Sequence, residues 1–164
     1  MKETILLDIT PGTPLALSST SKGDAMKWYL PEKDAFVKAN RFDHGREYQD
    51  SIAEVIAARL AAQMGIPAVE CQLCRIHLED GSTVLGTISP NFCEPEEQYI
   101  SFETMVESSY EPVHWGVSAR ENYELVLKWF HNLNGQDAHA YLDTMLLFDF
   151  LICNENRHLN NFGI

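Results

Sequence analysis

The chain has 164 residues, of which 45% are hydrophobic, so it is long enough to bury one domain-sized core. Its 24 acidic and 12 basic residues give a formal net charge of -12, which argues against a large nucleic-acid or anionic-membrane surface, because phosphate groups are bound by concentrated Lys and Arg. The sequence contains no apolar run of membrane-spanning length and no signal-peptide core after Met1, so we expect a cytoplasmic protein that binds neither nucleic acid nor membranes.

The first part of the chain predicts a β-rich lobe. Residues 5–9 form a short apolar strand that Pro11 interrupts. Residues 25–30 and 35–39 predict two strands, and the Pro-Glu-Lys-Asp sequence at 31–34 is typical of the tight turn that would join them. Between the first strands lies the loop 17–24, which is rich in small residues. Such loops lie over phosphate groups in nucleotide-binding lobes, and an ordinary Ser-rich surface loop has the same composition.

Lys38 stands inside the apolar strand 35–39 and needs a partner there, because burying an isolated ammonium group is costly. A nucleotide phosphate would suit it; alternatively the side chain lies on the wet face of an edge strand and reaches solvent. Residues 47–64 then show apolar side chains at helical spacing, with a stop at the following Gly. This predicted helix offers Glu54 as the ionic partner of Lys38, with Glu47 in reserve.

A second hairpin is predicted from strands at 69–78 and 83–89, around the Asp-Gly turn at 79–82. Cys71 and Cys74 have the spacing of a zinc-binding pair, but residues three apart in a strand point to opposite faces, and no second Cys or His pair follows at matching spacing. The pattern therefore favours a strand over a metal site, and the uneven spacing of the four cysteines is typical of reduced thiols.

Helical patterns replace strand patterns after Phe92. Ser118 and Glu121 form a capping box that opens a helix to about residue 133, and Asn-Gly at 134–135 closes it. The next helix, residues 138–153, is apolar on nearly every side and should be buried all round. Because each large side chain contributes about 1.5–3 kcal/mol on burial, we expect a chain that ends at Ile164, without later helices to cover this one, to leave a large sticky surface, with poor solubility or oligomerisation.

The segment 149–163, with the sequence DFLICNENRHLNNFG, carries the most specific pattern of the chain. It resembles the pattern D-x-L-I-x-N-x-D-R-H-x-x-N-F-G of HipA-like serine/threonine kinases, including the CtkA-type branch. Every fixed position matches except the catalytic Asp, which is Asn156 here. The resemblance implies a protein-kinase-like, two-lobe α+β fold, with a nucleotide-binding N-lobe over 1–92 and the first helices of an incomplete helical C-lobe over 93–164. Kinases need further chain after this loop, so we expect a longer protein.

The resemblance also implies an activity, namely the transfer of phosphate from ATP, with Mg²⁺, to a Ser or Thr hydroxyl of a protein. Residues at the phosphates and at the ion pair that supports them would be Ser19, Thr20, Ser21, Lys38 and Glu54.

The strand that leads to the kinase hinge would bring Ser89 and Asn91 to the adenine edge. In the catalytic loop, Asn161 would bind Mg²⁺ through its side-chain oxygen. Arg157 would orient backbone or a phosphoryl group, and His158 would hold the loop together.

Asn156 lies at the position of the general base, and its amide cannot accept a proton as a carboxylate does. Loss of a positioned base costs about 10²- to 10⁴-fold in rate. An engineered Asp-to-Asn change, a natural pseudokinase, and the use of Glu155 or Asp149 as the base all remain open. The alternative function is therefore an inactive nucleotide- or partner-binding module, such as the regulatory part of a toxin–antitoxin-like system with an antitoxin-like partner. A scaffold without ligand is the third interpretation.

Overall fold

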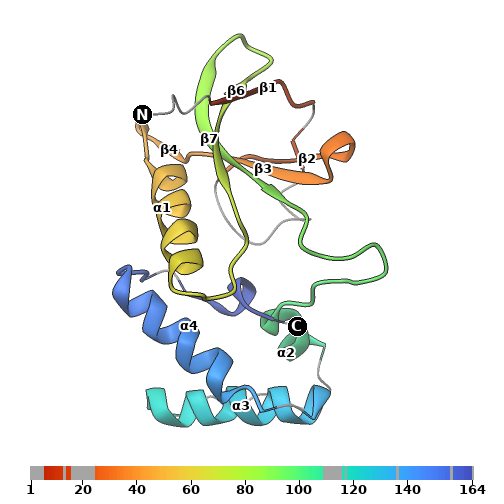
Figure 1. Cartoon of the computed structure of the whole chain (residues 1–164), viewed down its shortest axis with the longest axis vertical. Helices are drawn as coiled ribbons and strands as arrows, with labels where there is room; N and C mark the ends of the chain where they lie inside the picture. Colours follow the sequence, from red (N-terminus) through yellow and green to blue (C-terminus); the bar gives the residue numbers. More distant parts are fainter. Residues whose placement is uncertain are drawn as a thin grey trace. The chain divides into compact units, whose positions relative to one another are not determined.

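The computed structural model describes residues 6–12, 14–15, 25–108, 116, 118–135, 137–155 and 157–163. The chain divides into two compact units, Met1–Gln98 and Tyr99–Ile164. The first holds a mixed five-stranded sheet and one long helix, and the second is helical (Figure 1). The predicted α+β class is confirmed, whereas the kinase-like architecture stays a prediction.

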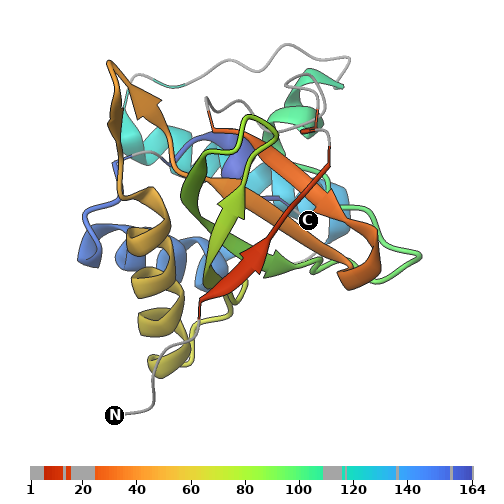
Figure 2. The ribbon, with the colours of Figure 1, turned by 90° about the horizontal axis from the view of Figure 1, so that it is seen from above.

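The sheet of the first unit has the order β1-β6-β7-β3-β2. Neighbouring strands are antiparallel except for β1, which runs parallel to β6 at one edge (Figure 2). The strands lie close to the ranges predicted from the sequence and are β1 Leu7–Ile9, β2 Lys27–Leu30, β3 Ala35–Ala39, β6 Gln72–His77 and β7 Thr83–Pro90.

One face of this sheet is apolar because hydrophobic residues alternate along its strands. The buried cluster on that face consists of Ile9, Trp28, Leu30, Ala35, Val37, Ala39, Cys74, Ile76, Val84 and Ile88. In β7, the backbone of β3 comes so close to Gly86 that no side chain fits there: a Cβ on Gly86 would lie 2.5 Å from the Lys38 carbonyl oxygen. The opposite face carries Lys38 and Thr87, and helix α1 (Asp50–Gln63) contacts β6 and β7.

The predicted start of this helix at residue 47 is wrong. A small hairpin precedes it, formed by β4 (Phe42–Asp43) and β5 (Arg46–Glu47). Its turn residues His44 and Gly45 both have positive φ, 48° and 77°. Two-residue strands carry no periodicity, so only the Gly in this turn could have signalled the break.

The second unit contains α2 (Phe102–Glu107), α3 (Ala119–Asn134) and α4 (His139–Leu151). The capping box of Ser118 and Glu121 is confirmed, and Gly135 in the left-handed conformation closes α3. The short helix α2 was not predicted. The buried core of the second unit consists of Phe102, Met105, Val126, Phe130, Ala138, Leu142 and Phe162.

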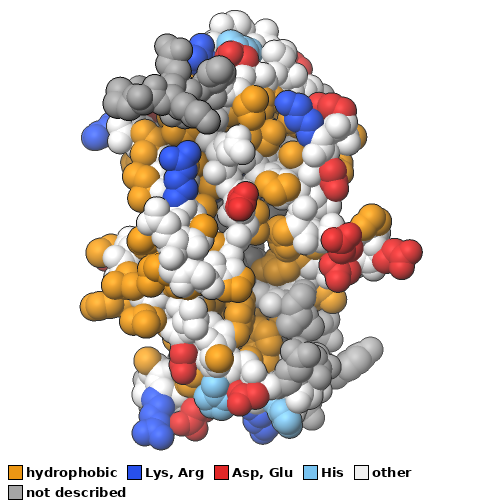
Figure 3. Space-filling view, viewed as in Figure 1, with side chains coloured by type: hydrophobic (Ala, Val, Ile, Leu, Met, Phe, Trp, Pro, Cys, Tyr) orange, Lys and Arg blue, Asp and Glu red, His pale blue; other side chains and the backbone are white. Residues whose placement is uncertain are grey.

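The apolar surface that was expected to stay exposed on α4 in a chain ending at Ile164 is confirmed among the described residues. Phe150 is 80% exposed, and Leu146, Leu147 and Leu151 are exposed as well. Hydrophobic side chains accordingly lie at the surface over this helix (Figure 3). None of the helices in the described part of the chain has both the length and the apolar composition that a membrane span requires.

Candidate functional site

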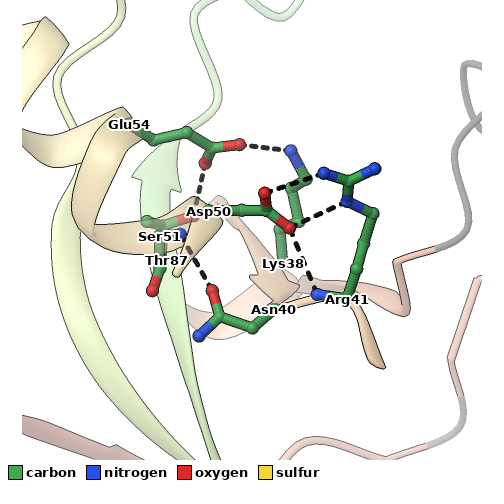
Figure 4. A network of polar contacts seen from close by, with 7 residues as sticks. All are labelled: Lys38, Asn40, Arg41, Asp50, Ser51, Glu54 and Thr87. Atoms are coloured by element: carbon green, nitrogen blue, oxygen red, sulfur yellow. Dashed lines mark hydrogen bonds and ion pairs between the residues drawn. The ribbon is translucent and has the colours of Figure 1, made fainter. Parts of the chain in front are cut away.

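The Lys38 ammonium group of β3 forms an ion pair with Glu54 of α1 (Figure 4). Lys38 points away from the core because it alternates with the buried Val37 and Ala39. The other carboxylate oxygen of Glu54 accepts a hydrogen bond from Thr87 Oγ1, at 3.1 Å. Thr87 is the partner of Lys38 in the β3–β7 register, so strand, helix and strand converge on one carboxylate. The Lys38 and Glu54 side chains are 39% and 36% exposed, which leaves the pair accessible to a ligand.

A second cation lies beside this pair. Lys27 of β2 is directly opposite Lys38 in the antiparallel register, so both side chains emerge from the same face of the sheet. Burial lowers the pKa of Lys27, the charge of Lys38 lowers it further, and Glu54 acts in the opposite direction. Lys27, Lys38 and Glu54 thus lie together on one face of the sheet, and ammonium groups are side chains that bind anionic ligands.

Sequence reasoning missed Lys27, although a signal was present. The predicted turn at 31–34 sets Leu30 opposite Ala35, and counting back along both strands brings Lys27 to Lys38. Register in a hairpin follows from turn length in this way.

Two aromatic rings continue the same face of the sheet. Tyr29 and Phe36 are opposite each other in the β2–β3 register, with ring centroids 5.1 Å apart, and both are exposed. The Tyr29 hydroxyl donates to Asp34 Oδ1 at 2.6 Å, and this hydrogen bond raises the pKa of Tyr29. Each ring lies two residues along its strand from a lysine, or about 7 Å. The face therefore offers apolar rings next to cations.

The other residues expected at the nucleotide lie as follows. Ser89 is opposite Phe36 on β7. The backbone N–H of Asn91 donates to the Asp34 carbonyl at 2.8 Å, and its side-chain oxygen accepts from the Cys93 N–H at 3.2 Å. The backbone N–H and the side-chain oxygen of Asn91 are thus engaged in hydrogen bonds within the first unit. Ser19, Thr20 and Ser21 lie outside the described residues.

In the second unit, Asp149 of α4 organises the segment that carries the family pattern. It is 6% exposed, and among the described residues it accepts hydrogen bonds from Arg157 Nε at 2.6 Å, Arg157 Nη2 at 2.7 Å and Asn154 Nδ2 at 2.8 Å. Burial alone would raise the pKa of Asp149, but the hydrogen bonds from Arg157 and Asn154 outweigh it and lower the pKa. The hydrogen bonds that Arg157 donates to Asp149 likewise raise the pKa of Arg157. A carboxylate engaged in this way is poorly placed to serve as a general base.

Arg157 also closes the loop, because its Nη1 donates to the backbone oxygen of Asn161 at 3.0 Å. The Asn161 N–H donates to the His158 oxygen at 2.9 Å, within the short 3₁₀ turn Leu159–Asn161. The side chains of His158 and Asn161 are exposed. Asn156, the residue at the predicted position of the general base, lies outside the described residues.

Phe162 and Gly163, at the end of the family pattern, pack this loop against the core of the second unit. Phe162 stacks on Phe102, with centroids 5.4 Å apart, and the Phe102 N–H donates to the Phe162 oxygen. A Cβ on Gly163 would lie 2.1 Å from the Ile100 carbonyl oxygen, so only Gly fits. These contacts give a physical reason for both residues.

Among the described residues, no group of three or more His, Cys, Asp or Glu side chains is arranged to hold a metal ion. The Asn161 amide suits Mg²⁺ only if phosphate oxygens and waters supply the remaining ligands, which is how this ion commonly binds beside nucleotides. Comparisons of the chain with family models, with curated proteins and with solved structures found no match.

Proposed function

We propose that this protein is an ATP-dependent serine/threonine protein kinase of the HipA-like type, whose first unit binds the nucleotide. The observation that carries the proposal is the ion pair between Lys38 on a strand and Glu54 on the following helix. In protein kinases a strand Lys contacts the phosphates and is held by a helix Glu. The resemblance of residues 149–163 to the kinase catalytic loop supports the same assignment independently.

In the proposed site, Lys38 and Lys27 donate hydrogen bonds to phosphate oxygens. Glu54 keeps the Lys38 ammonium extended from the sheet and offsets part of the repulsion between the two lysines. The purine base lies against Tyr29 and Phe36, where stacking is worth about 1–3 kcal/mol per base. The phosphates and the base thus use adjacent parts of one sheet face.

The second unit would supply the loop that receives the protein substrate. Asp149 and Arg157 hold this loop in shape, and Asn161 would hold Mg²⁺ together with phosphate oxygens. When bound, magnesium neutralises charge that develops on the transferred phosphoryl group. The substrate hydroxyl would be oriented by Asn156, whose amide can hydrogen-bond to it without taking its proton.

One observation favours a second candidate, the pseudokinase module. Asn156 replaces the expected carboxylate, and the buried Asp149 is committed to Arg157 and Asn154. On this alternative the nucleotide binds and no phosphate is transferred.

The decisive experiment measures phosphate incorporation from Mg-ATP by mass spectrometry, with the full-length protein and with its Asn156→Asp variant. Nucleotide binding is measured in parallel, with Lys38→Met as the control that should lose it. Labelling that requires Asn156→Asp, or is raised by it, supports a kinase scaffold. If neither form labels itself or added protein while both bind ATP, the pseudokinase candidate is correct. Absence of ATP binding in all forms would refute both.

A further inference from the structure

Asn40 is a buried amide just after β3, and both of its polar groups are engaged. It is 3% exposed. Its Oδ1 accepts a hydrogen bond from the Ser51 N–H at 2.8 Å, and its Nδ2 donates to Glu47 Oε1 at 2.9 Å (Figure 4 shows the former). The same Glu47 oxygen accepts from the Leu85 N–H of β7 at 3.0 Å. Asn40 therefore connects the first turn of α1 with the sheet.

This contact supplies the cap that α1 lacks in its own sequence. Gln49, at the N-cap position, forms no capping hydrogen bond through its side chain within the described residues. The first N–H groups of a helix have no partner inside the helix, and a side-chain oxygen normally satisfies one of them. Asn40 provides this oxygen from the strand. The next residue, Arg41, binds Asp50 in the same turn through Nε at 2.8 Å and Nη2 at 3.0 Å.

The geometry links this cap to the Lys38–Glu54 pair. Lys38 and Asn40 are two residues apart, so they emerge from the same side of the extended chain, about 7 Å from each other. Ser51 and Glu54 are three residues apart in the helix, which places them on one side at about 4.5 Å along its axis. The ion pair and the cap are thus two neighbouring cross-links between α1 and the end of β3 with the residue that follows it. Fixing one restricts where the other can form.

We propose that Asn40 is a positioning residue, which holds Glu54 against Lys38 by capping α1 from the end of β3. Its effect on nucleotide binding rests on the function proposed above, whereas its effect on the ion pair does not. An amide is required at this position because it accepts from Ser51 and donates to Glu47 at once. A carboxylate would keep the first bond and face Glu47 with like charge.

The test compares Asn40→Ala with the double variant Asn40→Asp/Glu47→Gln, in which donor and acceptor are exchanged. In the double variant the new carboxylate accepts from Ser51 and from the new amide nitrogen, which takes the place of the shared Glu47 oxygen, so the hydrogen bond from the Leu85 N–H to that oxygen is lost. The ¹⁵Nζ and ¹³Cε chemical shifts of Lys38 report on its pairing, and Glu54→Gln gives the shifts of the unpaired state. We expect Asn40→Ala to move the Lys38 shifts toward those of Glu54→Gln and the double variant to restore them.

Binding of Mg-ATP gives the second readout, measured well below the melting temperature of every variant. Asn40→Ala should weaken it about fivefold to tenfold, because a smaller fraction of molecules holds Lys38 in place. In a Glu54→Gln background the same substitution should change affinity less than about twofold, since Asn40 acts through Glu54. An equal effect in both backgrounds, or unchanged Lys38 shifts in Asn40→Ala, would overturn the proposal. Loss of ATP binding in the unmodified protein would instead overturn the kinase proposal and leave the shift experiment valid.

Discussion

Removing the Arg157 side chain should destabilise the protein strongly and in a pH-dependent way. Among the described side chains, Arg157 provides two of the three hydrogen bonds that Asp149 accepts, and the Asp149 side chain is only 7% exposed. Breaking a buried ion pair by removing one partner costs about 3–5 kcal/mol, because the other charge stays buried. Asn154 still donates one hydrogen bond, and Arg157 is partly exposed, so we expect the lower end, about 3 kcal/mol, for Arg157→Met at pH 7.

The pH dependence follows from the direction of the Asp149 pKa. In the intact protein this pKa is lowered, so the pair contributes stability above the pKa of an unfolded Asp, about 3.9, and loses it as the pH falls through the folded value. In Arg157→Met, burial outweighs the remaining hydrogen bond and raises the pKa, so acidification neutralises the buried charge. The difference in free energy of unfolding between the two proteins should therefore shrink from pH 7 toward pH 4.

Urea unfolding followed by circular dichroism at several pH values measures this difference. Adding Asp149→Asn to Arg157→Met removes the buried charge and should recover part of the lost stability at pH 7. A loss that is the same at every pH, or a double variant that is less stable than Arg157→Met, would refute the assignment of a charged pair.

Three further predictions concern the rest of the molecule. Gly163→Ala should lower the free energy of unfolding by about 1–3 kcal/mol or more, because the new Cβ meets the Ile100 carbonyl; calorimetry that shows no loss would contradict this close approach. Phe36→Ala should weaken ATP binding about tenfold and leave tripolyphosphate binding unchanged in titration calorimetry, whereas Lys27→Ala should weaken both ligands; equal losses for both ligands in Phe36→Ala would exclude a base platform. Phe150→Glu should reduce self-association in analytical ultracentrifugation, and a protein that is already monomeric without it would show that the exposed face of α4 is not sticky.

The sequence could predict the Lys38–Glu54 pair because each partner belongs to an element with its own strong pattern. β3 has five residues with regular alternation, and α1 has a long apolar repeat. The turn between β2 and β3 was recognised from Pro31 and its neighbours. In these places local chemistry and tertiary structure agree, so reading the chain locally was sufficient.

What escaped prediction depends on contacts between distant segments or on very short elements. Nothing near Asn40 in sequence indicates that it would cap a helix that starts ten residues later, since capping rules search only the residues next to the helix. The ion pair between Asp149 and Arg157 was also missed, because the family pattern gives the spacing of these two residues and not the hydrogen bonds between them.

The parallel pairing of β1 with β6 has a consequence for the order of folding. Leu7 pairs with Cys74, so closing this edge brings together segments that are far apart along the chain, at a high entropic cost. The cross-links of the candidate site span much less chain, 11 residues for Asn40 and Ser51 and 16 for Lys38 and Glu54. The β2–β3 hairpin and α1 can therefore assemble before β1 docks, and we expect the amides of β1 to exchange with solvent sooner than those of β3. During folding, Lys27 and Lys38 would then be brought together before β1 pairs with β6.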